Sequence, residues 1–160
     1  MSKVHEYKLV VTWTGNKGTG TSNYRAYDRN HTITTDGKAD ILGSSDPSFR
    51  GDKTRHNPEE LLVAAVSSCH MLSFLHMCAR AGVIVTDYED GATGFMEETA
   101  DGGGHFTKVI LHPKVTVREE SMKDKLDALH HQASELCFIA NSCNFPIYHE
   151  PVGIVQEKAK

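Results

Sequence analysis

The fold is decided by the stretch Asn57-Pro58-Glu59-Glu60-Leu61-Leu62-Val63-Ala64-Ala65-Val66-Ser67-Ser68-Cys69, which predicts the start of a long helix. Its first residue is a good N-cap, a proline suits the first helical position, and a glutamate stands three residues after the cap, as in a capping box. Residues 61–81 are apolar on nearly every helical face, and Gly82 is suited to end the helix. Because a helix that is apolar all round is a buried one, we expect it at the centre of the fold, covered by sheet or by another subunit.

The segments on both sides of this helix are typical of β-strands. The strand candidates before the helix are residues 7–13, 24–27, 31–35 and 38–42, followed by a polar loop over residues 43–56. After it we expect strands over residues 84–96 and 105–118, a second helix over residues 121–136 and a final strand over residues 146–156. This order predicts an α+β fold, and we expect residues 1–160 to form a single domain.

The composition excludes several classes of protein. The chain has 160 residues, with 17 Lys and Arg against 21 Asp and Glu, a net charge of −4. This mildly acidic balance argues against nucleic acid as a partner. The first residues lack the apolar core of a signal peptide, and the longest apolar run, residues 61–66, is too short to span a membrane. We therefore expect a cytoplasmic protein with no membrane partner, in which cysteines are not bridged into a scaffold.

Two of the four cysteines lie on the predicted central helix. Cys69 and Cys78 are nine residues apart, which places them on opposite faces and about 13 Å apart along the axis, so they cannot bridge each other within one chain. The helix dipole acts only in the first turn and cannot activate Cys69, which lies twelve residues past the cap. A reactive thiolate at Cys69 therefore needs a cation from elsewhere in the fold. Core packing is the preferred interpretation of Cys78 and the competing interpretation of Cys69.

The other two cysteines follow the second predicted helix. Cys137 lies at the end of that helix, where a side chain can swing as a resolving thiol must, although core packing would explain it equally well. Cys143 is interpreted as structural. The ten histidines show no metal-binding spacing, so we expect no metal and no cofactor.

The helix start and its cysteine resemble those of the OsmC/Ohr family of hydroperoxide-reducing proteins. Cys69 lies ten residues after Glu59, as in the family motif, and Cys137 lies 68 residues beyond Cys69, close to the family's spacing for its second cysteine. The resemblance covers nearly the whole chain. It implies an OsmC-like fold, in which antiparallel sheets pack around a long buried central helix in an intertwined homodimer.

The resemblance also implies a chemistry. In such proteins the first cysteine, here Cys69, attacks the peroxide O–O bond as a thiolate and becomes a sulfenic acid, and the second, here Cys137, condenses with it to a disulfide. This predicts a thiol-dependent peroxidase for organic hydroperoxides, with hydrogen peroxide as a further substrate. A dithiol reductant, of lipoyl type by the same resemblance, would restore the thiols.

The family also uses an arginine from the preceding loop to support the thiolate, oriented by the first glutamate of the motif, here Glu59. Arg50 is our choice for this arginine, with Arg55 and Arg25 as alternatives. His70, where the family often has an aromatic residue, lies 100° round the helix from the cysteine and is expected to point away from the reactive face.

Two other functions stay open on the sequence. The first is a non-catalytic dimer that binds a small apolar ligand in the same pocket, which would leave the thiol without its cation. The second is a zinc-binding protein, which the ten histidines suggest but their spacing does not support.

Overall fold

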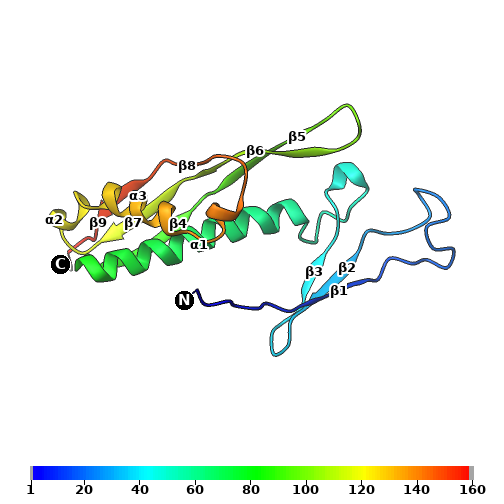
Figure 1. Ribbon diagram of the computed structural model, residues 1–160, viewed down its shortest axis with the longest axis horizontal. Coiled ribbons are helices and arrows are strands. Elements are labelled where there is room, and N and C mark those ends of the chain that lie inside the picture. The colour runs from blue at the N-terminus through cyan, green and yellow to red at the C-terminus, as the bar shows by residue number, and fades with distance from the viewer. Residues whose placement is uncertain (1, 159–160) are drawn as a thin grey trace. The chain divides into compact units, whose positions relative to one another are not determined.

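A computed structural model describes residues 2–158. The chain forms two compact units, one ending at Leu61 and one beginning at Leu62. Figure 1 shows the elements of both. The prediction of a single domain stays a prediction.

The first unit contains a three-stranded antiparallel sheet. Its strands are β1 (Val10–Trp13), β2 (His31–Thr34) and β3 (Ile41–Gly43), in the order β1-β2-β3. These confirm three of the predicted strands, although each is shorter than expected. The short 3-10 helix η1 (Pro47–Phe49) lies in the predicted polar loop, where the Asp46 carboxylate accepts a hydrogen bond from the Ser48 amide.

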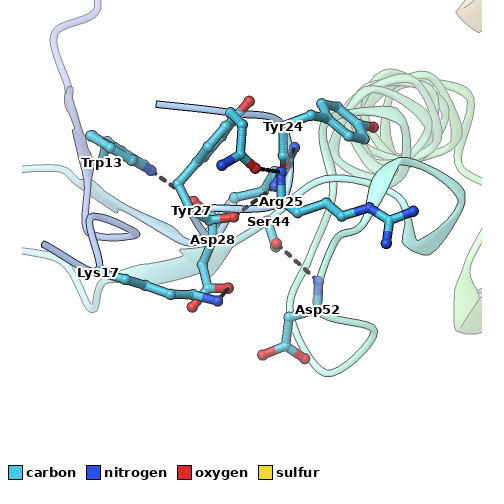
Figure 2. Close-up of polar contacts among 10 residues, drawn as sticks. Trp13, Lys17, Tyr24, Arg25, Tyr27, Asp28, Ser44 and Asp52 are labelled. Carbon is cyan, nitrogen blue, oxygen red and sulfur yellow. Dashed lines mark hydrogen bonds and ion pairs between the residues drawn. The ribbon is translucent and has the colours of Figure 1, made fainter. Parts of the chain in front are cut away.

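The predicted strand over residues 24–27 is wrong, because this segment forms turns. Arg29 explains the difference: its guanidinium donates to the carbonyl oxygens of Tyr24 and Tyr27, at 2.7 and 2.6 Å, and lies over both rings. Backbone carbonyls bound to one side chain are not available to a β-ladder. Figure 2 shows this loop closed further by Trp13, whose indole N–H donates to the carbonyl oxygen of Asp28.

The central helix α1 (Pro58–Ala81) begins and ends as the sequence predicts. The Asn57 carboxamide oxygen accepts from the Glu60 amide at 2.9 Å, and the Glu60 carboxylate accepts from the Asn57 amide at 3.4 Å, which completes the capping box. Gly82 then adopts a φ of 72°, a left-handed conformation that favours glycine and ends the helix.

The second unit holds two three-stranded sheets. In the first, β4 (Val85–Asp90) and β7 (Pro113–Val117) pair antiparallel, and β7 pairs parallel with β9 (Val152–Val155). In the second, β5 (Thr93–Glu98) and β6 (Gly104–Leu111) pair antiparallel, and β6 pairs parallel with β8 (Ile147–His149). Each of the two sheets thus combines an antiparallel pair, as the sequence predicted, with one parallel pair.

Each long strand expected after α1 is in fact two strands that belong to different sheets. The interruptions lie at residues 91–92, at His112 and at residues 150–151. Along the chain, β4 is followed by β5 and β6 is followed by β7. β5 and β6 pair in one sheet, and β4 and β7 pair in the other. The last strand divides in the same way, into β8 and β9. Local apolar patterning does not show such a break, because both halves keep strand-like residues.

The second predicted helix is likewise divided in two. α2 (Glu120–Lys123) and α3 (Leu126–Leu136) replace the single helix expected over residues 121–136, and the 3-10 helix η2 (Ala140–Ser142) follows. Leu126, Leu129 and Ala133 form a buried apolar stripe on α3, while Leu136 is 55% exposed.

The side chains of α1 contribute to both hydrophobic clusters of the second unit. Phe74 and Cys78 pack with side chains of β7 and α3, whereas Val66 packs with side chains of β6. Gly94 on β5 permits a close approach to α1, because a Cβ there would lie 2.5 Å from the Val63 side chain. The part of α1 between Val66 and Phe74 therefore connects the two clusters.

Within this chain α1 is buried along one stripe only, formed by residues 66, 70, 74 and 78, while Leu72 is 63% exposed. Cover by another subunit, the second arrangement that the sequence allows, stays a prediction. By length and composition alone, with a mean hydropathy of 1.7, α1 would also be able to cross a membrane, a property that it shares with the core helices of many soluble proteins.

Candidate redox site

The thiols of Cys69 and Cys137 meet between α1 and the end of α3. Cys69 is half-buried on α1, and Cys137 is 1% exposed at the C-cap of α3. Burial raises the pKa of the Cys137 thiol, and a hydrogen-bonding contact with the Cys69 thiol raises it further. The two cysteines that the sequence singled out thus lie beside each other within one chain.

The backbone after α3 determines where the Cys137 sulfur points. Cys137 leaves the helix with an extended conformation (φ −71°, ψ 111°), and the Ala140 amide donates to its sulfur at 3.4 Å. The Asn141 amide donates to the Cys137 carbonyl at 3.0 Å, and the Asn141 side chain donates to the Glu135 carbonyl at 3.0 Å. This turn fixes the cysteine at the helix junction, where the sequence predicted a thiol able to move.

The other two cysteines are core residues, as predicted. Cys78 packs in the cluster of Phe74, Val83 and Val115, where burial raises the pKa of its thiol to about 11. Cys143 is partly buried against the second cluster, and burial raises the pKa of its thiol as well. A thiol whose pKa is raised in this way has little thiolate at neutral pH and reacts slowly with reagents from solution.

Glu59 and Arg50 both lie in the first unit, without a partner among residues 2–158. The Oε2 atom of Glu59 is buried and accepts no hydrogen bond from the described chain. Arg50 is exposed and has a positive φ of 64° at the end of η1, and no ion pair of its guanidinium is found in this range. The described chain contains no ion pair between these two residues.

The alternative arginines differ in how far they are engaged. Arg55 donates to the His31 carbonyl at 3.2 Å and lies 4.0 Å from the Asp52 carboxylate, so it stabilises its own sheet. Arg25 is exposed, and in the described region its guanidinium has no carboxylate within ion-pair distance (Figure 2). Arg50 and Arg25 therefore stay available to a group outside their unit, whereas Arg55 is engaged.

A cluster of buried imidazoles beside the cysteines has no counterpart in the sequence-based prediction. His70 and His130 are 1% and 3% exposed, and their Nε2 and Nδ1 atoms lie 3.0 Å apart. The His149 ring lies 4.4 Å from the His70 ring, and the Phe74 ring stacks on His130 at 3.9 Å. His70 points away from the reactive face, as expected, but into this cluster.

The sequence did hold a signal for this pair. His70 occupies the same every-fourth-residue stripe as Val66, Phe74 and Cys78, and His130 lies four residues after the buried Leu126. A histidine in an apolar stripe predicts a buried imidazole. Among residues 2–158, no three His, Cys, Asp or Glu side chains are arranged to hold a metal ion.

The comparisons with known proteins agree with this architecture. Residues 51–150 match the family model for OsmC-like protein. A solved OsmC-like protein of unknown function from Vibrio cholerae is 36% identical, with a TM-score of 0.83 over 93% of this chain and 100% of that one.

Two further relatives are more distant. The organic hydroperoxide resistance protein OhrB of Bacillus subtilis shares the fold, with 19% identity and a TM-score of 0.63 over 92% of this chain and 98% of that one. The uncharacterized protein YmaD of Bacillus subtilis is 24% identical over 86% of each chain. The family model and the Vibrio cholerae relative decide the assignment, because together they span most of the chain at substantial identity. This protein belongs to the OsmC-like protein family.

Proposed function

We propose that this protein is a thiol-dependent peroxidase that reduces organic hydroperoxides, with hydrogen peroxide as a second substrate. The placement of the Cys69 and Cys137 thiols beside each other carries the proposal, because these are the two cysteines, 68 residues apart, that the motif spacing singles out. The names of several fold relatives, which are organic hydroperoxide resistance proteins, support it.

The proposed reaction has three balanced steps. The Cys69 thiolate attacks one peroxide oxygen, the O–O bond breaks, and the leaving alkoxide takes a proton to become the alcohol, while Cys69 becomes a sulfenic acid. Cys137 then attacks the Cys69 sulfur, forming the disulfide and releasing water. A dithiol reductant, of lipoyl type in this proposal, exchanges with the disulfide and returns both thiols.

Arg50 and Glu59 are proposed to keep Cys69 ionised, with the guanidinium against the sulfur and the carboxylate orienting the guanidinium. The buried, unpartnered Oε2 atom of Glu59 supports this, because an orphan carboxylate oxygen in a protein interior is costly until a donor reaches it. The exposed Arg50 has the planar donor fork that suits a carboxylate.

The proposed assembly is a homodimer in the cytoplasm. Apolar side chains left open at β1, on α1 and around the end of α3 support it, because exposed apolar patches mark interaction sites. These are Leu9, Val10, Val11, Trp13, Leu72, Leu136 and Phe138. A second copy of the chain would cover the open side of α1 and would bring a second set of loop arginines.

The test combines one oxidant with three variants. One equivalent of cumene hydroperoxide should convert the wild type to a Cys69–Cys137 disulfide, detected by peptide mapping. Cys137→Ser should consume one equivalent, stop at a sulfenic acid that dimedone traps at Cys69, and turn over no further with a dithiol. Cys143→Ser is the matched control and should behave as the wild type. If Cys69→Ser and Cys137→Ser both keep wild-type turnover, the proposal that these two thiols carry out the reaction is wrong.

The arginine is tested separately by the rate at which iodoacetamide alkylates Cys69. Arg50→Ala should slow this reaction about tenfold, the effect of losing roughly one pKa unit of thiolate stabilisation. Arg55→Ala and Arg25→Ala serve as controls and should leave the rate unchanged. A loss confined to Arg25→Ala would instead assign the role to Arg25.

A further inference from the structure

Two pairs of side chains connect α1 to the end of α3: Cys69 with Cys137, and His70 with His130. Cys69 and His70 are consecutive on α1, while His130 and Cys137 are seven residues apart around the end of α3. Seven residues correspond to almost two helical turns, so His130 and Cys137 project from nearly the same side of α3. The sulfur pair and the imidazole pair are therefore two separate links between the same two helices.

The imidazole link is direct and well supported by packing. His70 Nε2 and His130 Nδ1 lie 3.0 Å apart, a normal hydrogen-bond distance, with both rings inside the core. Phe74 stacks on the His130 ring from the α1 side, and His149 at the end of β8 lies against the His70 ring. The hydrogen bond is buried, so breaking it without replacement leaves a polar nitrogen unpaired.

The charge state of the pair keeps this bond intact at neutral pH. Burial lowers the pKa of His70 to about 3 and that of His130 to about 4. His149 acts on both rings in the same direction, whereas Asp127 and Asp90 oppose the shift at His130. Two neutral imidazoles offer one N–H donor and one lone pair at the shared contact, which is what a single hydrogen bond requires.

We propose that the His70–His130 hydrogen bond holds the end of α3 against α1 and so keeps the Cys137 thiol in attacking distance of the Cys69 sulfur. The inference rests on the proposed function for its effect on turnover. His70 and His130 are positioning residues that touch neither peroxide nor reacting sulfur. They act by raising the effective concentration of the Cys137 thiol at the Cys69 sulfur. This effective concentration governs how readily a disulfide forms within one chain.

The experiment uses variants that separate the hydrogen bond from the ring. His70→Phe keeps an aromatic ring but removes the hydrogen-bonding nitrogen. His70→Gln places an amide near the position of Nε2 and restores a donor or acceptor. His131→Phe is the matched control, because His131 neighbours His130 on α3 but is exposed.

Two readouts are taken for each variant. The first is the rate at which the Cys69 sulfenic acid, formed by one equivalent of cumene hydroperoxide, becomes the disulfide. The second is the equilibrium of the cysteine pair with reduced and oxidised glutathione, which gives the effective concentration of Cys137 at Cys69 without any peroxide. We expect His70→Phe to lower both by about tenfold, the effect of one lost buried hydrogen bond. His70→Gln should recover most of the loss, and His131→Phe should match the wild type.

The outcomes separate this inference from the proposed function. If peroxide does not react with Cys69 but the glutathione equilibrium falls in His70→Phe and recovers in His70→Gln, the peroxidase proposal fails and the positioning role stands. If His70→Phe keeps the wild-type equilibrium, or if His70→Gln is as impaired as His70→Phe, the positioning role is overturned. If His70→Phe does not fold, His130→Leu and His130→Asn repeat the comparison from α3, since the asparagine amide lies near the position of Nδ1.

Discussion

Cys69 and Cys78 lie on the same helix and have opposite chemical environments. Cys78 packs against Phe74, Val83 and Val115, and burial raises the pKa of its thiol to about 11. Cys69, nine residues earlier, is half-buried and contacts a second thiol at the end of α3. The helix therefore supplies only the position of each cysteine. The elements that pack against the helix decide whether that cysteine has a partner.

Replacing each of the two cysteines in turn should give the largest difference between them. Cys69→Ser should lower consumption of cumene hydroperoxide at least about a thousandfold, because the proposed nucleophile is lost. Cys78→Ala, measured in the same assay, should keep wild-type turnover and lose only stability. An equal loss of turnover in both variants would show that the assay follows folding and not chemistry.

Alkylation of the native protein sharpens the same contrast at Cys78. Iodoacetamide should modify Cys78 at least about a hundredfold more slowly than a free cysteine peptide at pH 7.5, because a thiol with a pKa raised to about 11 has little thiolate. Peptide mapping by mass spectrometry measures the rate for each cysteine. In urea, where the chain is unfolded, Cys78 should react like the peptide. Modification of native Cys78 at the peptide's rate would contradict its burial.

The buried histidines of α1 and α3 should make the stability of the protein depend on pH. In the folded protein His70 and His130 resist protonation to about pH 3 and about pH 4, whereas in the unfolded chain they take up protons near pH 6.5. The unfolded state therefore binds more protons in this window. Stability is fully present above pH 6.5 and is lost as the pH falls, by about tenfold in the unfolding equilibrium per histidine at pH 5.5.

Urea unfolding at a series of pH values measures this dependence. His70→Gln should flatten the curve by the contribution of one histidine, because glutamine does not titrate. His131→Gln should leave the curve unchanged, because His131 is exposed. An unchanged slope in His70→Gln would mean that His70 takes up its proton equally in the folded and unfolded states.

The smallest effect is expected at the start of α1. Asn57→Ala removes the side chain that accepts from the Glu60 amide and should cost about 1 kcal/mol of unfolding free energy. Thermal unfolding measures the loss. The cap lies about 18 Å along the helix from Cys69 and further from Cys78, so the alkylation rates of both should not change. A change at Cys69 alone would link the cap to the redox site.

The sequence predicted the local features of the fold well, because they depend on neighbouring residues. The capping box at Asn57, the end of α1 at Gly82 and three strands of the first sheet were all visible in it. It failed at residues 24–27, because one guanidinium from Arg29 takes the carbonyls that a strand would use. It also failed at the strand breaks, because a strand changes sheets in response to partners far away in the chain.

By itself, the sequence determined the α+β class, the long helix and the two cysteines in question, since helix caps, apolar stripes and motif spacing are local properties. The tertiary structure decided that Cys69 lies beside Cys137 while Cys78 packs in an apolar cluster. It also paired His70 with His130 inside the core. These contacts join residues 60 or more positions apart. Their existence depends on how α3 packs against α1, which is a property of the whole folded unit.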